Sequence, residues 1–260
     1  MKSTQFGNYA RFYDLLYRDK NYSGESQYIN SLISKFCKKS KEDISVLDLA
    51  CGTGRHLIEL SNLGYERLNG SDISSSMIEM AKENMVRFNK NISLHNYSFQ
   101  ESDRIGSSGF DIVLSMFSAV NYITSFEDQV KSLQNVNHLL KEDGLFIFDY
   151  WNGNAVVRDY SPIKVLRKED GDREIIRISR TRIDRIEQSA EVSFQCIYLE
   201  EDKKIDDFEE VHHLHYYFIS EMRSLLKMSQ FKIIQESPFM EERELDPFDW
   251  NISVVAQKKK

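Results

Sequence analysis

The chain has 260 residues, of which 41% are hydrophobic and 29% are charged, and its formal net charge is -7. This length suffices for one full-size core, or for one core that carries a substantial insertion. No apolar run approaches the roughly 18 residues that a membrane span requires. The only dense basic run is the lysine triplet at residues 258–260. Composition therefore argues against both nucleic acid and a membrane as partners.

The first residues, "MKSTQFGNYARFYDLLY", are aromatic and polar and do not resemble a secretory signal. Cys37, Cys51 and Cys196 form an odd set without metal-ligand spacing, which is typical of reduced thiols. We therefore expect a cytoplasmic protein that has no disulfide and no bound metal.

The first half of the chain alternates between strand-like and helix-like patterns. The stretch up to about Lys41 predicts one or two helices, one of which has an apolar face in "GESQYINSLISKFCKK". Strands are predicted at residues 44–49 and in "RLNGSD", "ISLHNY", "FDIVLSM" and "LFIFDY". Helices are predicted in "SSMIEMAKENMVRFN" and in "FEDQVKSLQNVNHLLKEDG", the latter ending at Gly144. This alternation predicts a parallel sheet.

The pattern changes after Trp151. Three stretches, "REIIRISRTRID", "AEVSFQCIYLEE" and "FEEVHHLHYYF", alternate polar and apolar residues as antiparallel strands do, and charged turns separate them. A helix in "SEMRSLLKMSQ" and strands in "FKIIQES" and "NISVVAQ" follow. We predict an α/β fold with a doubly wound, mainly parallel seven-stranded sheet formed by residues 1–152 and 218–260. An antiparallel β insertion, residues 153–217, would follow the fifth strand and cover the active site.

The stretch "VLDLACGTGRHL" places an acid and two glycines at the end of the first predicted strand. Gly52 and Gly54 allow a ligand to approach the backbone closely, at the edge where doubly wound sheets bind nucleotides. Leu57 stands where a dinucleotide-binding motif has its third glycine. Asp48 is a poor neighbour for a pyrophosphate but a good one for an ammonium or sulfonium group, and S-adenosylmethionine carries both. The alternative is that Asp48 only caps the turn.

Asp72, at the end of the second strand, is placed to accept the hydroxyl groups of an adenosine ribose. Together with Asp48 and the glycine turn, Asp72 points to a resemblance. About residues 44–150 resemble the first three sequence blocks of class I S-adenosylmethionine-dependent methyltransferases, in "VLDLACGTGRHLIEL", "GSDISSSMIEMAKEN" and "LKEDGLFIFD". The resemblance implies that Asp48, Gly52 and Gly54 line the methionine part of this cofactor and that Asp72 holds its ribose.

One block departs from the family pattern, because "NYSFQES" stands where an acid commonly binds the adenine amino group. Ser98 or a backbone group would make that contact instead. The residues that we expect around S-adenosylmethionine are Tyr13, Tyr17, Tyr22, Asp48, Ala50, Gly52, Gly54, Arg55, Asp72, Ile73, Met77, Ser98, Phe99, Ser115 and Met116.

A wider resemblance includes "YARFYDLLYRDKNY", "MFSAVNYI", "DYW" and "VHHLHYYF". Together these are similar to sugar N-methyltransferases that act on nucleotide-linked amino sugars, although the similarity thins out over residues 153–205. It implies a small polar acceptor, with the N-terminal segment closing over the cofactor. The expected catalytic residues are His212, Tyr17 and Asn121. The expected substrate contacts are Phe117, Asn121, Tyr122, Trp151, His213 and His215.

Each of these assignments has a purely structural alternative. The tyrosines and Trp151 could pack in the core, and the histidines could be ordinary surface residues. Strand alternation would put His213 and His215 on one face and His212 on the other, without a third metal ligand. Rival functions are O-methylation with His212, His213 or Asp149 as the base, an adenosyl-binding protein without turnover, and a nicotinamide-dependent dehydrogenase. The oligomeric state, a homodimer included, stays open.

Overall fold

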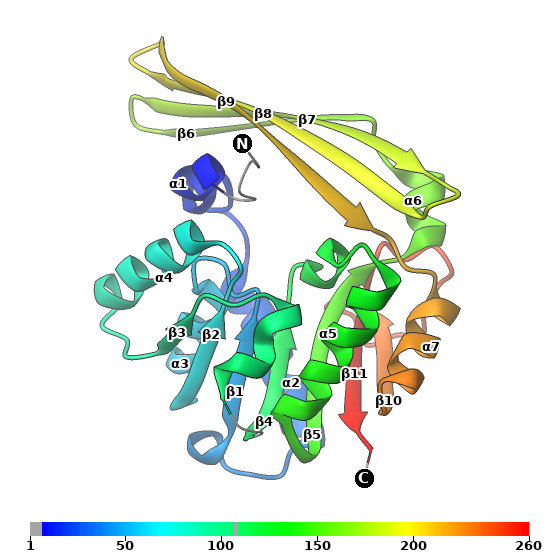
Figure 1. The fold of residues 1–260 in the computed structure, drawn as a ribbon. Helices are drawn as coiled ribbons and strands as arrows, with labels where there is room; N and C mark the ends of the chain where they lie inside the picture. Colours follow the sequence, from blue (N-terminus) through cyan, green and yellow to red (C-terminus); the bar gives the residue numbers. More distant parts are fainter. Residues whose placement is uncertain (1–6, 107–108, 260) are drawn as a thin grey trace.

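The computed structural model describes residues 7–106 and 109–259 and contains two sheets (Figure 1). The larger sheet has seven strands in the order β10-β11-β5-β4-β1-β2-β3. Pairing is parallel from β5 to β3, whereas β11 runs antiparallel to both of its neighbours. The strands span Ser45–Leu49 (β1), Arg67–Ser71 (β2), Ser93–His95 (β3), Phe110–Ser115 (β4), Leu140–Trp151 (β5), Phe231–Pro238 (β10) and Asn251–Lys258 (β11). The predicted fold class is confirmed.

Helices cover both faces of this sheet. One apolar core holds side chains from α5, α7 and the central strands, and a second core holds side chains from α2, α3 and α4. The strands between these cores are buried on both sides, which explains why β1 and β4 read as nearly continuous apolar runs. The α-helices of this unit are α1 (Gly7–Leu16), α2 (Tyr22–Phe36), α3 (Arg55–Asn62), α4 (Ser75–Arg87), α5 (Phe126–Leu139) and α7 (Ile219–Met228), and the short 3-10 helices are η1 (Lys41–Asp43), η2 (Phe99–Ile105) and η3 (Ala119–Tyr122).

The second sheet is the insertion that follows β5. It begins with α6 (Gly153–Asp159) and continues as four antiparallel strands: β6 (Ile163–Asp170), β7 (Arg173–Asp184), β8 (Ser189–Glu200) and β9 (Lys203–His215). Figure 1 shows this sheet lying across the upper end of the molecule, with α1 between it and the main sheet. Side chains of α1 and of the insertion share a small apolar core, which includes Phe12, Ile175 and Cys196.

Three details differ from the sequence-based expectations. The fifth helix ends at Leu139 and not at Gly144, because Leu140 already pairs with Phe110 of β4. The insertion has four strands where three were predicted, since β6 is mostly exposed and its apolar pattern is weak. The charged stretch expected to form a turn before β9 largely belongs to that strand, which begins at Lys203 and pairs along β8.

Within the described part of the chain, no helix is both long and apolar enough to cross a membrane.

Candidate functional site

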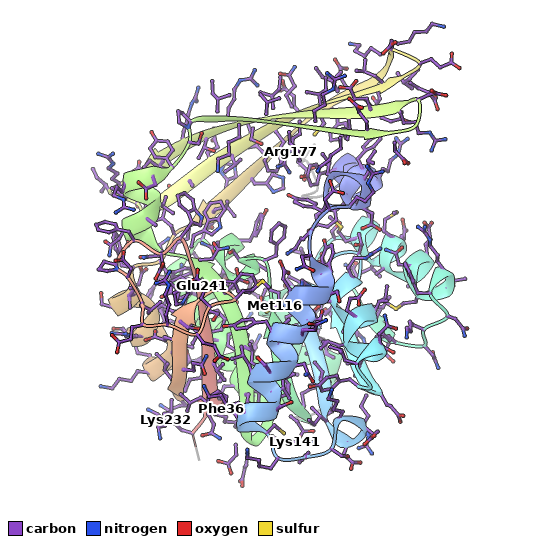
Figure 2. All side chains as sticks on the ribbon, turned by 180° about the vertical axis from the view of Figure 1, so that it is seen from behind. Phe36, Met116, Lys141, Arg177, Lys232 and Glu241 are labelled. Atoms are coloured by element: carbon purple, nitrogen blue, oxygen red, sulfur yellow. The ribbon has the colours of Figure 1, made fainter. Side chains whose placement is uncertain are left out.

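A cavity of about 280 Å³ lies where the carboxyl ends of the parallel strands face the insertion. In Figure 2, which views the molecule from behind, Met116 lies at the upper edge of the main sheet and Arg177 lies in the insertion sheet above it. We refer to the part of the lining at and directly after the carboxyl ends of β1, β2 and β4 as the floor; it includes Asp48, Ala50, Gly52, Asp72 and Met116. We refer to the part from α1, the turn after it and the insertion as the roof; it includes Tyr9, Tyr13, Tyr17, Val192, Phe194 and His212.

The turn between β1 and α3 has the backbone conformation that its glycines suggested. Ala50, Gly52 and Gly54 all have positive φ values, of 64°, 54° and 77°. A Cβ atom added to Gly52 would meet nothing within 4 Å, so this residue leaves its side of the turn open. A Cβ atom added to Gly54 would lie 2.6 Å from the Cε atom of Met85, so Gly54 serves the packing of α3 against α4. The two glycines thus have different physical roles.

Asp48 is the buried acid of the floor, with an exposed fraction of 1%. Its Oδ2 atom has no hydrogen-bond partner among the described residues. Burial raises the pKa of this carboxyl to about 7; the nearby His56 opposes the shift, and the carboxylate of Asp72 adds to it. A buried acceptor without a donor costs free energy. The position of Asp48 in the cavity lining therefore fits a ligand that brings a cationic donor, such as the ammonium group of the methionine part of the cofactor.

Asp72 joins the ends of β1 and β2. Its Oδ2 atom accepts a hydrogen bond of 2.9 Å from the Gly52 amide, and its Oδ1 atom accepts one of 2.8 Å from the Ser74 amide. Burial raises its pKa, although these two bonds oppose that shift. Each carboxylate oxygen has a second lone pair, so Asp72 keeps the capacity to accept ribose hydroxyl groups. The Asn96 side chain donates to the carbonyl oxygens of Asp72 and Ile73 and fixes the loop that follows β2.

The far end of the floor is less polar. Ile73 lies on the cavity with 58% of its surface exposed, and Met77 and Phe99 are buried beside it. Ser98 and Gln100 line the same end. Apolar side chains with a few polar groups suit a flat heterocycle such as adenine.

Aromatic side chains dominate the boundary between floor and roof. The Tyr9 ring stacks on Phe194, with ring centroids 5.3 Å apart, and the Tyr17 ring meets Phe117 edge to face at 5.2 Å. The Lys20 Nζ atom lies 4.5 Å from the centre of the Phe117 ring, a cation–π distance. Phe117 itself has a positive φ of 63°, a strained conformation of the kind that concentrates at functional sites.

Hydrogen bonds join the N-terminal segment both to the floor and to the insertion sheet. The Asp14 carboxylate accepts a hydrogen bond of 2.7 Å from the Thr53 hydroxyl, in the turn after β1. On the other side, the Arg177 guanidinium donates to the hydroxyl groups of Tyr9 and, at 2.9 Å, Tyr17. The N-terminal helix therefore links the floor to the insertion sheet.

His212 is the histidine of β9 that faces the cavity. Its Nδ1 atom lies 3.0 Å from the Tyr122 hydroxyl, and its Nε2 atom lies 3.3 Å from a carboxylate oxygen of Glu210. Burial, together with the nearby charges of Arg177 and His213, lowers the pKa of His212 to about 4. The imidazole is therefore neutral at neutral pH and is a weak base.

Most of the residues expected from the sequence line this one cavity. They are Tyr13, Tyr17, Tyr22, Asp48, Ala50, Gly52, Arg55, Asp72, Ile73, Met77, Ser98, Phe99, Met116, Phe117, Tyr122, Trp151 and His212.

Five expected residues lie outside the lining, for packing reasons. Gly54 faces α4, and Ser115 is buried inside the sheet. Asn121 is buried below the cavity, where it donates to the His215 carbonyl and accepts from the Trp151 amide. His213 points outward from β9 and is exposed, and the His215 ring is bonded to Glu221 at 2.9 Å. These five residues therefore do not line the cavity, and their contact with a ligand stays a prediction.

Sequence reasoning missed several lining residues. Thr53 and His56 flank the recognised turn and could have been included with it. Val192, Phe194 and Leu214 share the inner face of the insertion with His212, as strand alternation allows, but the sequence does not say which face is inner. The remaining missed lining residues are Tyr9, Lys20, Cys51, Tyr97, Gln100, Ser118, Ala119, Ile123 and Asn251.

The described residues hold no cluster of three or more His, Cys, Asp or Glu side chains able to bind a metal ion.

Comparison with known proteins agrees with this geometry. Residues 46–144, which include the turn, Asp48 and Asp72, match the family model of the methyltransferase domain. The whole chain superimposes on an S-adenosylmethionine-dependent methyltransferase from Clostridium acetobutylicum with a TM-score of 0.83 and 19% identity, covering 97% of this chain and 98% of the other. The chain contains a methyltransferase domain and has the fold of an S-adenosylmethionine-dependent methyltransferase.

Two other proteins similar to this methyltransferase are named for their acceptors. The dTDP-3-amino-3,4,6-trideoxy-alpha-D-glucopyranose N,N-dimethyltransferase of Streptomyces venezuelae is 29% identical over 146 residues, which are 55% of this chain and 57% of that relative. The similarity thus spans little more than half the length of that curated relative. The sugar N-methyltransferase KedS8 from Streptoalloteichus sp. superimposes with a TM-score of 0.80 at 18% identity, covering 100% of this chain and 96% of KedS8.

Proposed function

We propose that this methyltransferase acts on the amino group of a small polar acceptor, an amino sugar carried on a nucleotide. The observation that carries the proposal is the state of His212, a buried imidazole whose pKa is lowered to about 4 by burial and nearby charge. An acceptor that needs no strong base fits such a cavity best.

The cofactor side of the proposal rests on the floor. Asp48 would hold the ammonium group, Asp72 the ribose, and the end formed by Ser98 and Phe99 the adenine ring. When bound, S-adenosylmethionine supplies a methyl group whose bond to sulfur breaks as a bond from the acceptor forms, and the electron pair stays with sulfur. The residues around it align the two partners and exclude water, which is the main requirement of an in-line displacement.

Whether the methyl group goes to a nitrogen or an oxygen atom depends on which general bases the cavity offers. A sugar hydroxyl is a weak nucleophile and gains from a positioned general base. Of the three candidates, His212 is a weak base, His213 points away from the cavity, and Asp149 lies outside the lining and accepts the Ser118 hydroxyl at 2.7 Å. An amine is different, because transfer from water into this aromatic cavity lowers its pKa and favours the neutral, nucleophilic form. The acceptor ammonium therefore gives up one proton on entering the cavity, and the methylated nitrogen leaves as an ammonium ion, the form that water favours.

The acceptor itself is proposed from two supports. The relatives named above act, by their names, on the amino groups of sugars, one of them linked to dTDP. The roof offers aromatic rings from Tyr9, Tyr17 and Phe194, which suit the faces of a sugar that has lost hydroxyl groups. We further propose that the insertion, residues 153–217, forms the part of the enzyme that selects the acceptor.

The test is methyl transfer to paired nucleotide-linked sugars that differ only in carrying an amino or a hydroxyl group at one carbon, with products measured by mass spectrometry. We expect methylated amine and no methylated hydroxyl. Methylation of the hydroxyl sugars alone would overturn the proposal.

The variant His212→Ala gives a second measure on whichever acceptor reacts. We expect kcat to fall by no more than about 10-fold, because loss of a general base costs about 10²–10⁴-fold. The exposed neighbour in His213→Ala serves as the control and should leave kcat unchanged. A thousand-fold loss in His212→Ala would assign a base to the reaction and favour O-methylation.

A further inference from the structure

Two consecutive residues after β4 have a backbone conformation that residues with a side chain rarely adopt. Phe117 and Ser118 have φ values of 63° and 55°. Among the described residues, the other such pair without glycine is Glu201 and Asp202, in the exposed turn between β8 and β9. The pairing of two strands stabilises a hairpin turn of that kind. No hairpin follows β4, which is parallel to both of its neighbours and leads into η3, so Phe117 and Ser118 need another source of stability.

The carboxylate of Asp149 holds this turn from the neighbouring strand. β5 pairs with β4 up to Ser115 and Phe148 and then continues, so Asp149 lies beside the turn. The Ser118 hydroxyl donates to Asp149 Oδ2 at 2.7 Å, and the Ser118 amide also donates to this carboxylate. Ser118 is the N-cap residue of η3, but its hydroxyl makes no capping bond within that helix. Its bonds to Asp149 fix the turn instead.

Burial of Asp149 is not explained by packing alone. Its exposed fraction is 1%, and its Oδ1 atom has no hydrogen-bond partner among the described residues. Burial raises the pKa of this carboxyl, and the two bonds from Ser118 oppose that shift. Because a buried carboxyl group costs free energy where its oxygens lack partners, we look for its role in the bonds that it does make. Those bonds lead to the turn after β4.

The turn held by Asp149 presents the Phe117 ring to the N-terminal segment. The ring lines the cavity and is 44% exposed. Tyr17 meets it edge to face at 5.2 Å, and Lys20 Nζ lies 4.5 Å from its centre. Glu25 of α2 pairs with Lys20 and so keeps the ammonium group near the ring. Phe117 thus joins the end of β4 to the segment of residues 17–20.

We propose that Asp149 is a positioning residue of this methyltransferase: through Ser118 it holds the Phe117 ring in the cavity, and the ring in turn keeps the segment 17–20 in place. Asp149 itself lies outside the cavity lining, so it acts through these two residues. The effect on kinetics rests on the proposed function, whereas the effect on the segment does not. A loosened segment aligns the acceptor less well, and in-line displacement depends on that alignment.

Two substitutions of Ser118 separate the backbone conformation from the hydroxyl group. Ser118→Ala and Ser118→Gly both lose the hydroxyl, but only glycine adopts a positive φ without a steric cost. We expect kcat/KM for the acceptor to fall by about 30-fold in Ser118→Ala and by only about 5-fold in Ser118→Gly. Equal losses in the two variants would mean that the hydroxyl group acts on the ligand itself, and would overturn the proposal.

Substitutions of Asp149 test whether it acts through Phe117. Asp149→Asn keeps an oxygen that accepts from Ser118 and should stay within about 3-fold of the wild type in kcat/KM. Asp149→Ala and Phe117→Ala should each lose about 30-fold, and their double variant should lose no more, since both changes break the same contact. Losses that multiply in the double variant contradict the proposal, and so does an Asp149→Asn variant as impaired as Asp149→Ala.

Phe126→Ala is the matched control for the loss of an exposed phenylalanine ring. Phe126 has an exposed fraction of 56% and lies outside the cavity lining. This variant should leave kcat and KM unchanged.

A measurement without any acceptor separates this inference from the proposed function. The Lys20 side chain is only 11% exposed, so a lysine-specific endoproteinase cuts after it only when the segment 17–20 opens. Cleavage after Lys20, followed by mass spectrometry, should be about 10-fold faster in Asp149→Ala and in Phe117→Ala than in the wild type. Asp149→Asn should behave as the wild type does. An unchanged rate in Asp149→Ala would remove Asp149 from this role.

Cleavage after Lys141 reports general loosening of the fold, because Lys141 lies at the opposite end of the main sheet (Figure 2). Its rate should not change in any variant. Faster cleavage at both lysines in Asp149→Ala would mean that Asp149 only stabilises the fold, and the proposal would fail. If cleavage behaves as expected and no amino sugar is methylated, the acceptor assignment fails and the positioning role of Asp149 stands.

Discussion

The floor and the roof of the cavity are built in different ways. The floor takes Asp48, Ala50, Gly52 and Asp72 from the ends of two adjacent strands, and two backbone amides hold Asp72 in place. The roof takes Tyr17 from the turn directly after α1 and His212 from a strand almost 200 positions later, and it is held by contacts between side chains. The floor depends on backbone conformation, whereas the roof depends on side-chain identity.

This difference suggests which part of the enzyme is adaptable. A binding surface made by glycine turns and strand ends tolerates few changes, because a new side chain alters the backbone itself. A sheet face can exchange side chains without losing its pairing. One chain can therefore keep a constant cofactor site while the acceptor site varies. The predictions below test that division.

The largest effect is expected on the floor. Asp48→Ala removes the buried acceptor proposed to hold the cofactor's ammonium group, and we expect affinity for S-adenosylhomocysteine to fall by about 100-fold, the upper range for a hydrogen bond to a charged group. Calorimetric titration measures it. Asp103→Ala, an exposed acid on η2, is the control and should bind normally. Unchanged affinity in Asp48→Ala would remove Asp48 from the cofactor site.

A smaller effect is expected within the roof, where the N-terminal segment meets the insertion sheet. Arg177→Leu removes the donor to Tyr9 and Tyr17 while keeping apolar bulk beside Phe194. The helix should then be less well held, so that KM for the acceptor rises by about 10-fold, while affinity for S-adenosylhomocysteine changes less than 2-fold. Steady-state kinetics and calorimetry give the two numbers. If acceptor KM and affinity for S-adenosylhomocysteine worsened by the same factor, the floor and the roof would not act independently.

The roof should also show a characteristic dependence of stability on pH. His212 has a folded-state pKa of about 4, below its ordinary value, so the unfolded chain takes up a proton first as the pH falls. Its neutral form therefore contributes stability above about pH 6.5 that is lost between about pH 6.5 and 4. Urea unfolding measures the free energy of unfolding of the wild type and of His212→Asn at each pH. Between pH 6.5 and 4 this free energy should fall more steeply in the wild type. Parallel curves would contradict the assignment, and His213→Asn is the exposed control.

The floor should show the opposite sign, with the smallest effect. The pKa of Asp48 is raised to about 7 in the folded protein, so its contribution to stability is present at low pH and is lost as the pH rises through 7. Without ligand, Asp48→Asn should raise the Tm by a few degrees at pH 8 and change it less at pH 5. Scanning calorimetry at the two pH values tests this. A lower Tm at pH 8 would mean that the carboxylate stabilises the free enzyme.

The sequence predicted the main sheet better than the insertion. The strands around Asp48 are short apolar runs between helical patterns, and such runs indicate buried parallel strands whatever their partners are. The strand β6 carries little apolar signal because it lies at an edge and is largely exposed, so only its pairing with β7 reveals it. Likewise, Leu140 could continue a helix in isolation, and its pairing with Phe110 decides otherwise.

The sequence by itself determined the fold class, the turn with Asp48, Gly52 and Gly54, and the acid at the end of β2, because local backbone preference and strand order place these residues together. The tertiary structure decided which face of the insertion looks inward and that His212 of β9 meets Tyr122 of η3. Alternation along a strand gives two equivalent faces. Only the packing of that sheet on α1 makes one of them the roof.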